Sequence, residues 1–337
     1  MKTKLIPIMA SAIIGLLNQT HGQSSTNEAS IAEKEFLKTQ NHPALRINEG
    51  SGYFERMGGL GHQEDTIRVY YHKPKNFTAQ SKILLVIPGS GRNGDDYRDS
   101  WIEASEKHSV LIISPSYAEK NYGYGDYHLG GIVSNLNILE SVTFKENSNI
   151  VELNEEKVKY ELNLTPGEWI YDDFDRLFEE VAIAVGSSQT AYDIFGHSAG
   201  GQILHRFALF APHSKANRIL ASNSGSYTPP DSTEDFPFGI KNIGLQEENL
   251  KQSFRKKLVL FLGELDNENE TGGLMLRSPT VDKQGTHRLQ RGKYFYWKSQ
   301  ETAKTMNATF NWRLQIIPDV GHNQKKMAGA AAIYLYE

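Results

Sequence analysis

Apolar runs alternate along this chain with segments whose apolar residues recur at helical spacing. The runs have the length of strands and end in glycine or polar residues, which is the pattern of strands in a sheet. We expect strands within residues 65–72, 82–91, 108–117, 191–201, 216–225, 256–266 and 311–319. Because most of these runs are apolar throughout, the sheet should be covered on both faces.

The segments between the runs predict helices. Residues 171–186 place apolar side chains three and four positions apart and end in glycine, and residues 201–211 and 293–306 have a similar pattern. Strands that alternate with helices predict an α/β fold, with a mostly parallel central sheet and helices on both faces.

The residues that could take part in catalysis lie at the ends of the expected strands. Ligands of open parallel sheets gather beyond the carboxyl ends of the strands. In this sequence Ser90, Ser198, Asp266 and His322 each follow an expected strand. We therefore expect the functional site at this edge of the sheet.

One segment does not fit the alternation. Residues 118–168 are rich in tyrosine and glycine at first and then polar, and they are too long for a simple connection between a strand and a helix. We interpret them as an insertion near the site. The remaining pattern predicts a single domain over residues 50–337, preceded by a polar tail over residues 23–49.

The first 22 residues have the features of a signal peptide. A basic start precedes an apolar stretch that is too short to cross a bilayer, and Thr20 and Gly22 suit the positions before a cleavage site. A membrane anchor or a buried helix is the alternative. A cleaved signal predicts a secreted or periplasmic protein with no stable membrane insertion.

The composition of the chain excludes several kinds of chemistry and of binding partner. The 337 residues are 39% hydrophobic with a formal net charge of −4, which allows a sizeable core and gives no basic stripe for nucleic acid. The chain has no cysteine, so disulfides and thiol catalysis are excluded. It has no pair of histidines at metal-binding helical spacing, and we expect no metal and no cofactor.

The junction Gly196-His197-Ser198-Ala199-Gly200 joins an expected strand to an expected helix. A sharp turn from strand to helix strains its middle residue and exposes the side chain above the sheet, and small neighbours let the backbone close up. The Ala199 amide would then open the helix, where unpaired amides favour an anion. An ordinary turn packed through glycine is the alternative.

Three further residues suit acyl transfer. His322 follows the last strand, Asp266 lies between it and Ser198 in the chain, and the glycine loop around Ser90 can present a second backbone amide. The order serine, aspartate, histidine matches an α/β-hydrolase. Glu264, Glu268 and Glu270 are alternative acids, and Asp319 more simply shapes the loop before the histidine.

With these residues the chain resembles the α/β-hydrolase superfamily. More narrowly it is similar to exported serine esterases of the polyhydroxyalkanoate-depolymerase and feruloyl-esterase type, over roughly residues 65–330. The resemblance implies the α/β-hydrolase fold and an exported serine hydrolase that cleaves carboxylic esters, in small molecules or polymers, through an acyl-enzyme. Ser198, Asp266 and His322 would form the triad, with Ser90 and Ala199 in the oxyanion hole. A serine peptidase or amidase and a non-catalytic binding relative are the alternatives.

Several other residues are candidates to line the substrate site. Aromatic side chains of the expected insertion could stack on a substrate, or they could pack the insertion onto the body. The candidates are Tyr124, Tyr127, Trp169, His197 and Tyr227.

Basic residues and further histidines leave two interpretations open. Arg288 and Arg291 could receive a substrate carboxylate, or they could form salt bridges at the start of a helix. His128, His205 and His287 suit a structural or lining position better than a catalytic one.

Overall fold

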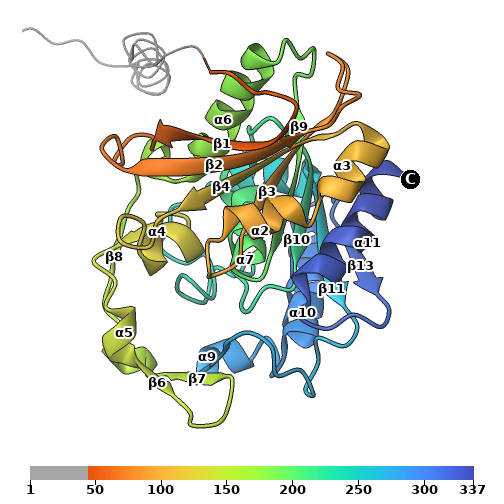
Figure 1. Ribbon diagram of the computed structural model, residues 1–337. Coiled ribbons are helices and arrows are strands. Elements are labelled where there is room, and N and C mark those ends of the chain that lie inside the picture. Colours follow the sequence, from red (N-terminus) through yellow and green to blue (C-terminus); the bar gives the residue numbers. More distant parts are fainter. Residues whose placement is uncertain (1–44) are drawn as a thin grey trace, which may run out of the picture. The chain divides into compact units, whose positions relative to one another are not determined.

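A computed structural model describes residues 45–337, which form one compact unit around an eight-stranded sheet (Figure 1). Along the sheet the strands follow the order β1-β2-β4-β3-β9-β10-β11-β13. Their bounds are β1 Gly50–Met57, β2 Thr66–Lys73, β3 Ile83–Ile87, β4 Leu111–Tyr117, β9 Tyr192–His197, β10 Ala216–Ser222, β11 Lys257–Gly263 and β13 Arg313–Ile317.

The sheet is mostly parallel, as the sequence predicts. The strand pairs from β4 through β13 are parallel, and β1 and β2 add an antiparallel edge. Every strand expected from the sequence is present. The edge strand β1 was not expected, because its side chains alternate between exposed and partly buried positions without a clear apolar run.

Helices cover both faces of the sheet. Their bounds are α2 Gly94–Asp99, α3 Ile102–His108, α4 Tyr124–His128, α5 Ile138–Ser141, α6 Tyr171–Ala184, α7 Ala199–Phe210, α8 Glu247–Arg255, α9 Pro279–Asp282, α10 Arg288–Thr305 and α11 Gln324–Tyr336, with short 3-10 helices at Glu155–Lys157 (η1) and Pro166–Glu168 (η2). The expected helices correspond to α6, α7 and α10, whereas α8 and α11 had no sequence-based expectation.

Alternation along the central strands divides the core into two layers. In β3, Leu85 packs with Phe174 and Phe207 of α6 and α7, whereas Leu84 and the neighbouring Val86 pack on the other face with α2 and α11. Apolar side chains on both sides of each strand therefore bury the sheet completely, which is the reason for the continuous apolar runs.

Residues 118–168 lie between β4 and α6 and divide into two parts. The first part is core, because Tyr122, Tyr127 and Ile132 have no exposed surface. The second part forms small sheets of its own. Strand β5 (Val133–Ser134) pairs with β8 (Glu161–Leu162), and β6 (Val142–Phe144) forms a hairpin with β7 (Ile150–Leu153).

The hairpin of β6 (Val142–Phe144) and β7 (Ile150–Leu153) joins a distant segment. Strand β12 (Met275–Arg277) adds to it in parallel, next to α9 (Figure 1). Segments more than 120 positions apart in the sequence thus meet in one three-stranded sheet.

The expected signal peptide and most of the expected polar tail lie outside the described residues. Within residues 45–337, no helix is long and apolar enough to cross a membrane.

Candidate functional site

Ser198 lies in a strained turn between β9 and α7. Its φ of 60° and ψ of −115° lie in a region that non-glycine residues rarely adopt. The flanking glycines allow the turn because a side chain at Gly196 would overlap the carbonyl of Gly200, and one at Gly200 would overlap the carbonyl of Ile87. The strain expected from the sequence is therefore present, and the close packing explains the need for glycine.

Ser198, His322 and Asp266 form a continuous chain of hydrogen bonds. Ser198 Oγ is 3.1 Å from His322 Nε2, and His322 Nδ1 is 2.8 Å from Asp266 Oδ2. The side chains of His322 and Asp266 are only 6% and 2% exposed. Because Asp266 accepts at Nδ1, the imidazole carries its proton there and offers Nε2 to the serine hydroxyl.

The fold brings these residues together at one edge of the sheet. Ser198 directly follows β9, Asp266 lies three residues beyond β11, and His322 lies between β13 and α11. All three strands are parallel members of the same half of the sheet, so their carboxyl ends lie at the same edge.

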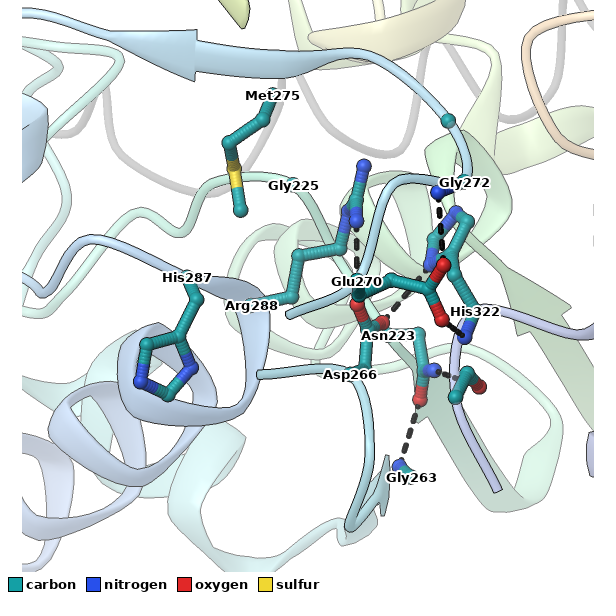
Figure 2. Close-up of polar contacts among 12 residues, drawn as sticks. Asn223, Gly225, Gly263, Asp266, Glu270, Gly272, Met275, His287, Arg288 and His322 are labelled. Carbon is teal, nitrogen blue, oxygen red and sulfur yellow. Dashed lines mark hydrogen bonds and ion pairs between the residues drawn. The ribbon is translucent and has the colours of Figure 1, made fainter. Parts of the chain in front are cut away.

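The loop that follows Asp266 also supports the histidine (Figure 2). Glu270 accepts hydrogen bonds from the backbone amides of His322 at 2.6 Å and Gly272 at 2.7 Å. A side chain at Gly273 would come within 2.9 Å of His322 Nε2, so the backbone of the loop lies directly against the imidazole. Glu270 is thus placed on the main chain of the histidine, whereas Asp266 contacts its ring.

Asn223 links the strand that precedes the acid to the loop that carries the histidine. It accepts a hydrogen bond from the Gly263 amide at 3.0 Å and donates one to the Gly321 carbonyl at 3.1 Å (Figure 2). Nothing in the sequence pattern pointed to Asn223. Its only local signal is an asparagine at a strand end, where it adopts a φ of 49°.

The two arginines near the start of α10 are buried in polar contacts. Arg288 donates to Asp266 Oδ1 at 3.1 Å and to the Leu274 carbonyl at 2.8 Å. Arg291 donates to backbone carbonyls, among them that of Gly225, and pairs with Asp282. Of the two interpretations, the salt bridge is therefore the one that the structure shows.

The two expected oxyanion donors lie on segments that meet at the serine. Ala199 is the first residue of α7, where helical amides have no intrahelical acceptor. Gly89, next to the exposed Ser90, approaches so closely that a side chain on it would lie 3.6 Å from Ser198 Cβ. The loop after β3 thus borders Ser198.

His197 is also part of this cluster. It is 2% exposed, and its ring centroid lies 4.6 Å from that of His322. Burial, together with the neighbouring His322 and Arg288, holds the pKa of His197 well below its usual range. His197 is therefore an uncharged ring that packs against the histidine of the hydrogen-bonded chain.

The aromatic residues expected to line the substrate site differ in burial and in the groups that they contact. Tyr127 is buried and donates to the Pro88 carbonyl at 2.8 Å, so it supports the loop after β3 from within. Tyr227 is buried against Phe295, and the partly exposed Tyr124 stacks on His128.

Trp169 is not brought to the serine. Its ring packs on Phe210, at the far end of the helix that Ser198 begins. A twelve-residue helix is about 18 Å long, which separates the two ends of α7. Trp169 instead lines a different pocket, together with Asp175 and His213.

Comparison with known proteins agrees with the observed fold and shows the family to which the chain belongs. A parallel sheet with a strained serine between a strand and a helix defines the α/β-hydrolase class. Poly(aspartic acid) hydrolase-1 from Sphingomonas sp. KT-1 is 31% identical, with a TM-score of 0.71, and the match covers 86% of this chain and 100% of that one. The chain belongs to the same family of α/β-hydrolases, of the esterase and depolymerase type, and it is a hydrolase.

A second solved structure has the same fold. LpqC, a poly(3-hydroxybutyrate) depolymerase from Bordetella parapertussis, is 24% identical with a TM-score of 0.71, and the match covers 86% of this chain and 91% of that one. A scan against family models gave no match, and a search of curated proteins gave none.

Proposed function

We propose that this protein hydrolyses carboxylic esters through an acyl-enzyme formed on Ser198. The observation that carries the proposal is the hydrogen-bonded chain from the Ser198 hydroxyl through His322 to the buried Asp266. A serine hydroxyl is a weak nucleophile unless an adjacent base removes its proton, and this chain supplies the base and the group that orients it.

Each side chain has a defined step in this mechanism. His322 Nε2 takes the proton from Ser198 as the oxygen attacks the ester carbonyl, and then gives it to the departing alcohol. Asp266 holds the imidazole in the correct tautomer and stabilises the imidazolium. Water enters, loses a proton to His322 and attacks the acyl-enzyme, which releases the acid and restores Ser198.

The backbone amides of Ala199 and Ser90 would stabilise the tetrahedral oxyanion. Both belong to segments that border the serine, and the Ala199 amide also benefits from the positive end of the α7 dipole. The loss of one such donor typically raises the barrier by about 3 kcal/mol.

Amide hydrolysis is the second candidate. The relative that shares 31% identity is named for poly(aspartic acid), a polymer whose units are joined by amide bonds. The same nucleophile, base and oxyanion donors serve both bond types. A polymeric substrate, whether ester or amide, is thus part of the proposal, as is export through the signal sequence at residues 1–22.

The first experiment compares the full chain with its Ser198→Ala variant. Both are assayed at pH 8 on p-nitrophenyl acetate, butyrate and octanoate, and on poly(aspartic acid) with detection of released amines. We expect ester turnover in the parent and a loss of more than about a thousandfold in the variant. Amine release without ester turnover would favour the amidase, and equal activity in both proteins would contradict Ser198 as the nucleophile.

A further inference from the structure

Arg288 forms a buried ion pair with the carboxylate that orients His322. Its Nη1 lies 3.1 Å from Asp266 Oδ1, while the other carboxylate oxygen faces the imidazole (Figure 2). The side chains of Arg288 and Asp266 are each 2% exposed. Little solvent is therefore present to screen the arginine charge from the histidine.

The arginine is fixed from two sides. Its second terminal nitrogen, Nη2, donates to the Leu274 carbonyl at 2.8 Å, in the loop that lies against His322. Arg288 is the first residue of α10. The backbone amide of the next residue, Leu289, donates to the Asp266 carbonyl at 3.0 Å. Asp266 is thus held to α10 through both its side chain and its backbone.

Other titratable groups around the pair do not supply a cation. His197 packs on His322 and is held uncharged by burial, and burial also raises the pKa of the neighbouring Tyr227, which keeps its phenol protonated. Glu270 binds the backbone amide of His322. Among the described residues, Arg288 is the one arginine or lysine in an ion pair with Asp266.

We propose that Arg288 is a positioning residue that fixes the Asp266 carboxylate and limits how strongly this carboxylate stabilises the His322 imidazolium. This inference rests on the proposed function of Ser198 and His322. The arginine offsets part of the carboxylate charge, so Asp266 stabilises the imidazolium less than a lone carboxylate would. Removal of the arginine charge should therefore let Asp266 stabilise the imidazolium more strongly.

The test uses the rate at which a fluorophosphonate probe labels the full chain between pH 4.5 and 9. Labelling needs an activated Ser198 and no knowledge of the natural substrate. In the Arg288→Gln variant, a donor remains but the charge is lost. We expect the acid limb of the labelling profile to move to higher pH, on the order of one pH unit.

Two matched variants separate charge from structure. Arg288→Lys keeps the charge, so its acid limb should stay at the parent position, while its maximal rate falls because lysine lacks the arginine fork that reaches Asp266 and Leu274 together. Arg277→Gln removes the same charge from a partly exposed pair with Asp282 and should leave the profile unchanged. Thermal unfolding of every variant shows whether each one is folded.

The outcomes are distinct. A parent that is not labelled at Ser198 contradicts the proposed function and this inference with it. A labelled parent with an Arg288→Gln profile at the same pH contradicts the inference alone. If Arg288→Gln does not fold, Arg288→Lys carries the test: a limb that moves despite the retained charge, or an unchanged maximal rate, would overturn the positioning role.

Discussion

At the scale of single residues, the structure gives different contacts to four carboxylates, of which the sequence favoured Asp266 because it falls just beyond its strand. Asp266 contacts the imidazole of His322, and Glu270 binds the backbone amide of the same residue. Glu264 accepts from the Asp319 amide, earlier in the same loop, and Glu268 is exposed. Glu270 therefore supports the histidine through its main chain. Its charge-assisted hydrogen bond, 2.6 Å long, is of the strong kind.

Replacement of Glu270 by glutamine should impair the histidine loop. One of its two accepting oxygens would become an amide group that faces a backbone amide. A partly buried donor is then left unpaired, and the cost for a buried donor is about 1–3 kcal/mol. We expect kcat/KM for p-nitrophenyl esters to fall at least tenfold with little change in the far-ultraviolet circular dichroism.

The neighbouring Glu268 supplies the control. Its side chain is 70% exposed, and its contact with His287 is at 3.5 Å, so Glu268→Gln should retain the parent activity. Equal activity of the Glu270 variant and this control would show that the loop does not need the carboxylate.

At the scale of elements, the position of α7 depends on contact between its first turn and the neighbouring strands. Side chains at Gly200 and Gly201 would overlap the carbonyls of Ile87 and Ser222, which belong to the ends of β3 and β10. The helix thus begins directly on the strands that flank β9. This close approach places the Ala199 amide next to the loop after β3.

Two glycine-to-alanine substitutions in helices should therefore have opposite effects. In Gly200→Ala the new methyl group meets rigid backbone, and we expect a loss of at least about 2 kcal/mol in the free energy of unfolding. In Gly329→Ala, within α11, the new methyl group would meet no atom within 4 Å apart from its chain neighbours and the local helix backbone, and a better helix former should add about 0.5–1 kcal/mol. Urea unfolding measures both, and similar values for the two variants would contradict the packing argument.

At the scale of the whole molecule, folding buries histidines in the neutral form. His205 donates from Nδ1 to the Gly201 carbonyl and accepts at Nε2 from the Thr228 amide, an arrangement that only the neutral ring allows. Burial lowers the pKa of His205 well below its usual range and that of His128 to about 3. These groups make the stability of the protein depend on pH.

Stability should fall as the pH drops below about 6.5. The unfolded chain then binds a proton at His128, whereas the folded chain does not until about pH 3, and the resulting loss is about 2 kcal/mol at about pH 5. We expect His128→Phe, which keeps an aromatic ring beside Tyr124, to remove this part of the loss between pH 7 and 5 in urea unfolding. His213→Phe, at an exposed position, should lose as much stability as the parent does. An unchanged pH dependence in His128→Phe would contradict a neutral buried ring.

The sequence by itself determined every strand of the main sheet except the edge strand β1, and the nature of the serine turn. Strands buried on both faces need continuous apolar runs, and a tight turn needs glycine, so β3, β9, β11 and the turn at Ser198 were readable from local pattern. The expected parallel sheet also predicted that Ser198, Asp266 and His322 lie at the carboxyl ends of strands, at one edge of the sheet.

Only the tertiary structure decided the surroundings of these residues. The supporting contacts come from Arg288, Asn223 and Glu270. Their partners are between 22 and 98 positions away in the sequence or are backbone atoms. Neither kind of contact produces a periodic pattern in the sequence. Trp169 was expected at the substrate site, but it packs at the end of α7 that lies far from Ser198. The aromatic residues around it in the sequence could not show which end of this helix its ring would contact. Periodicity reports which face of an element is buried, whereas contacts between loops depend on how whole elements pack.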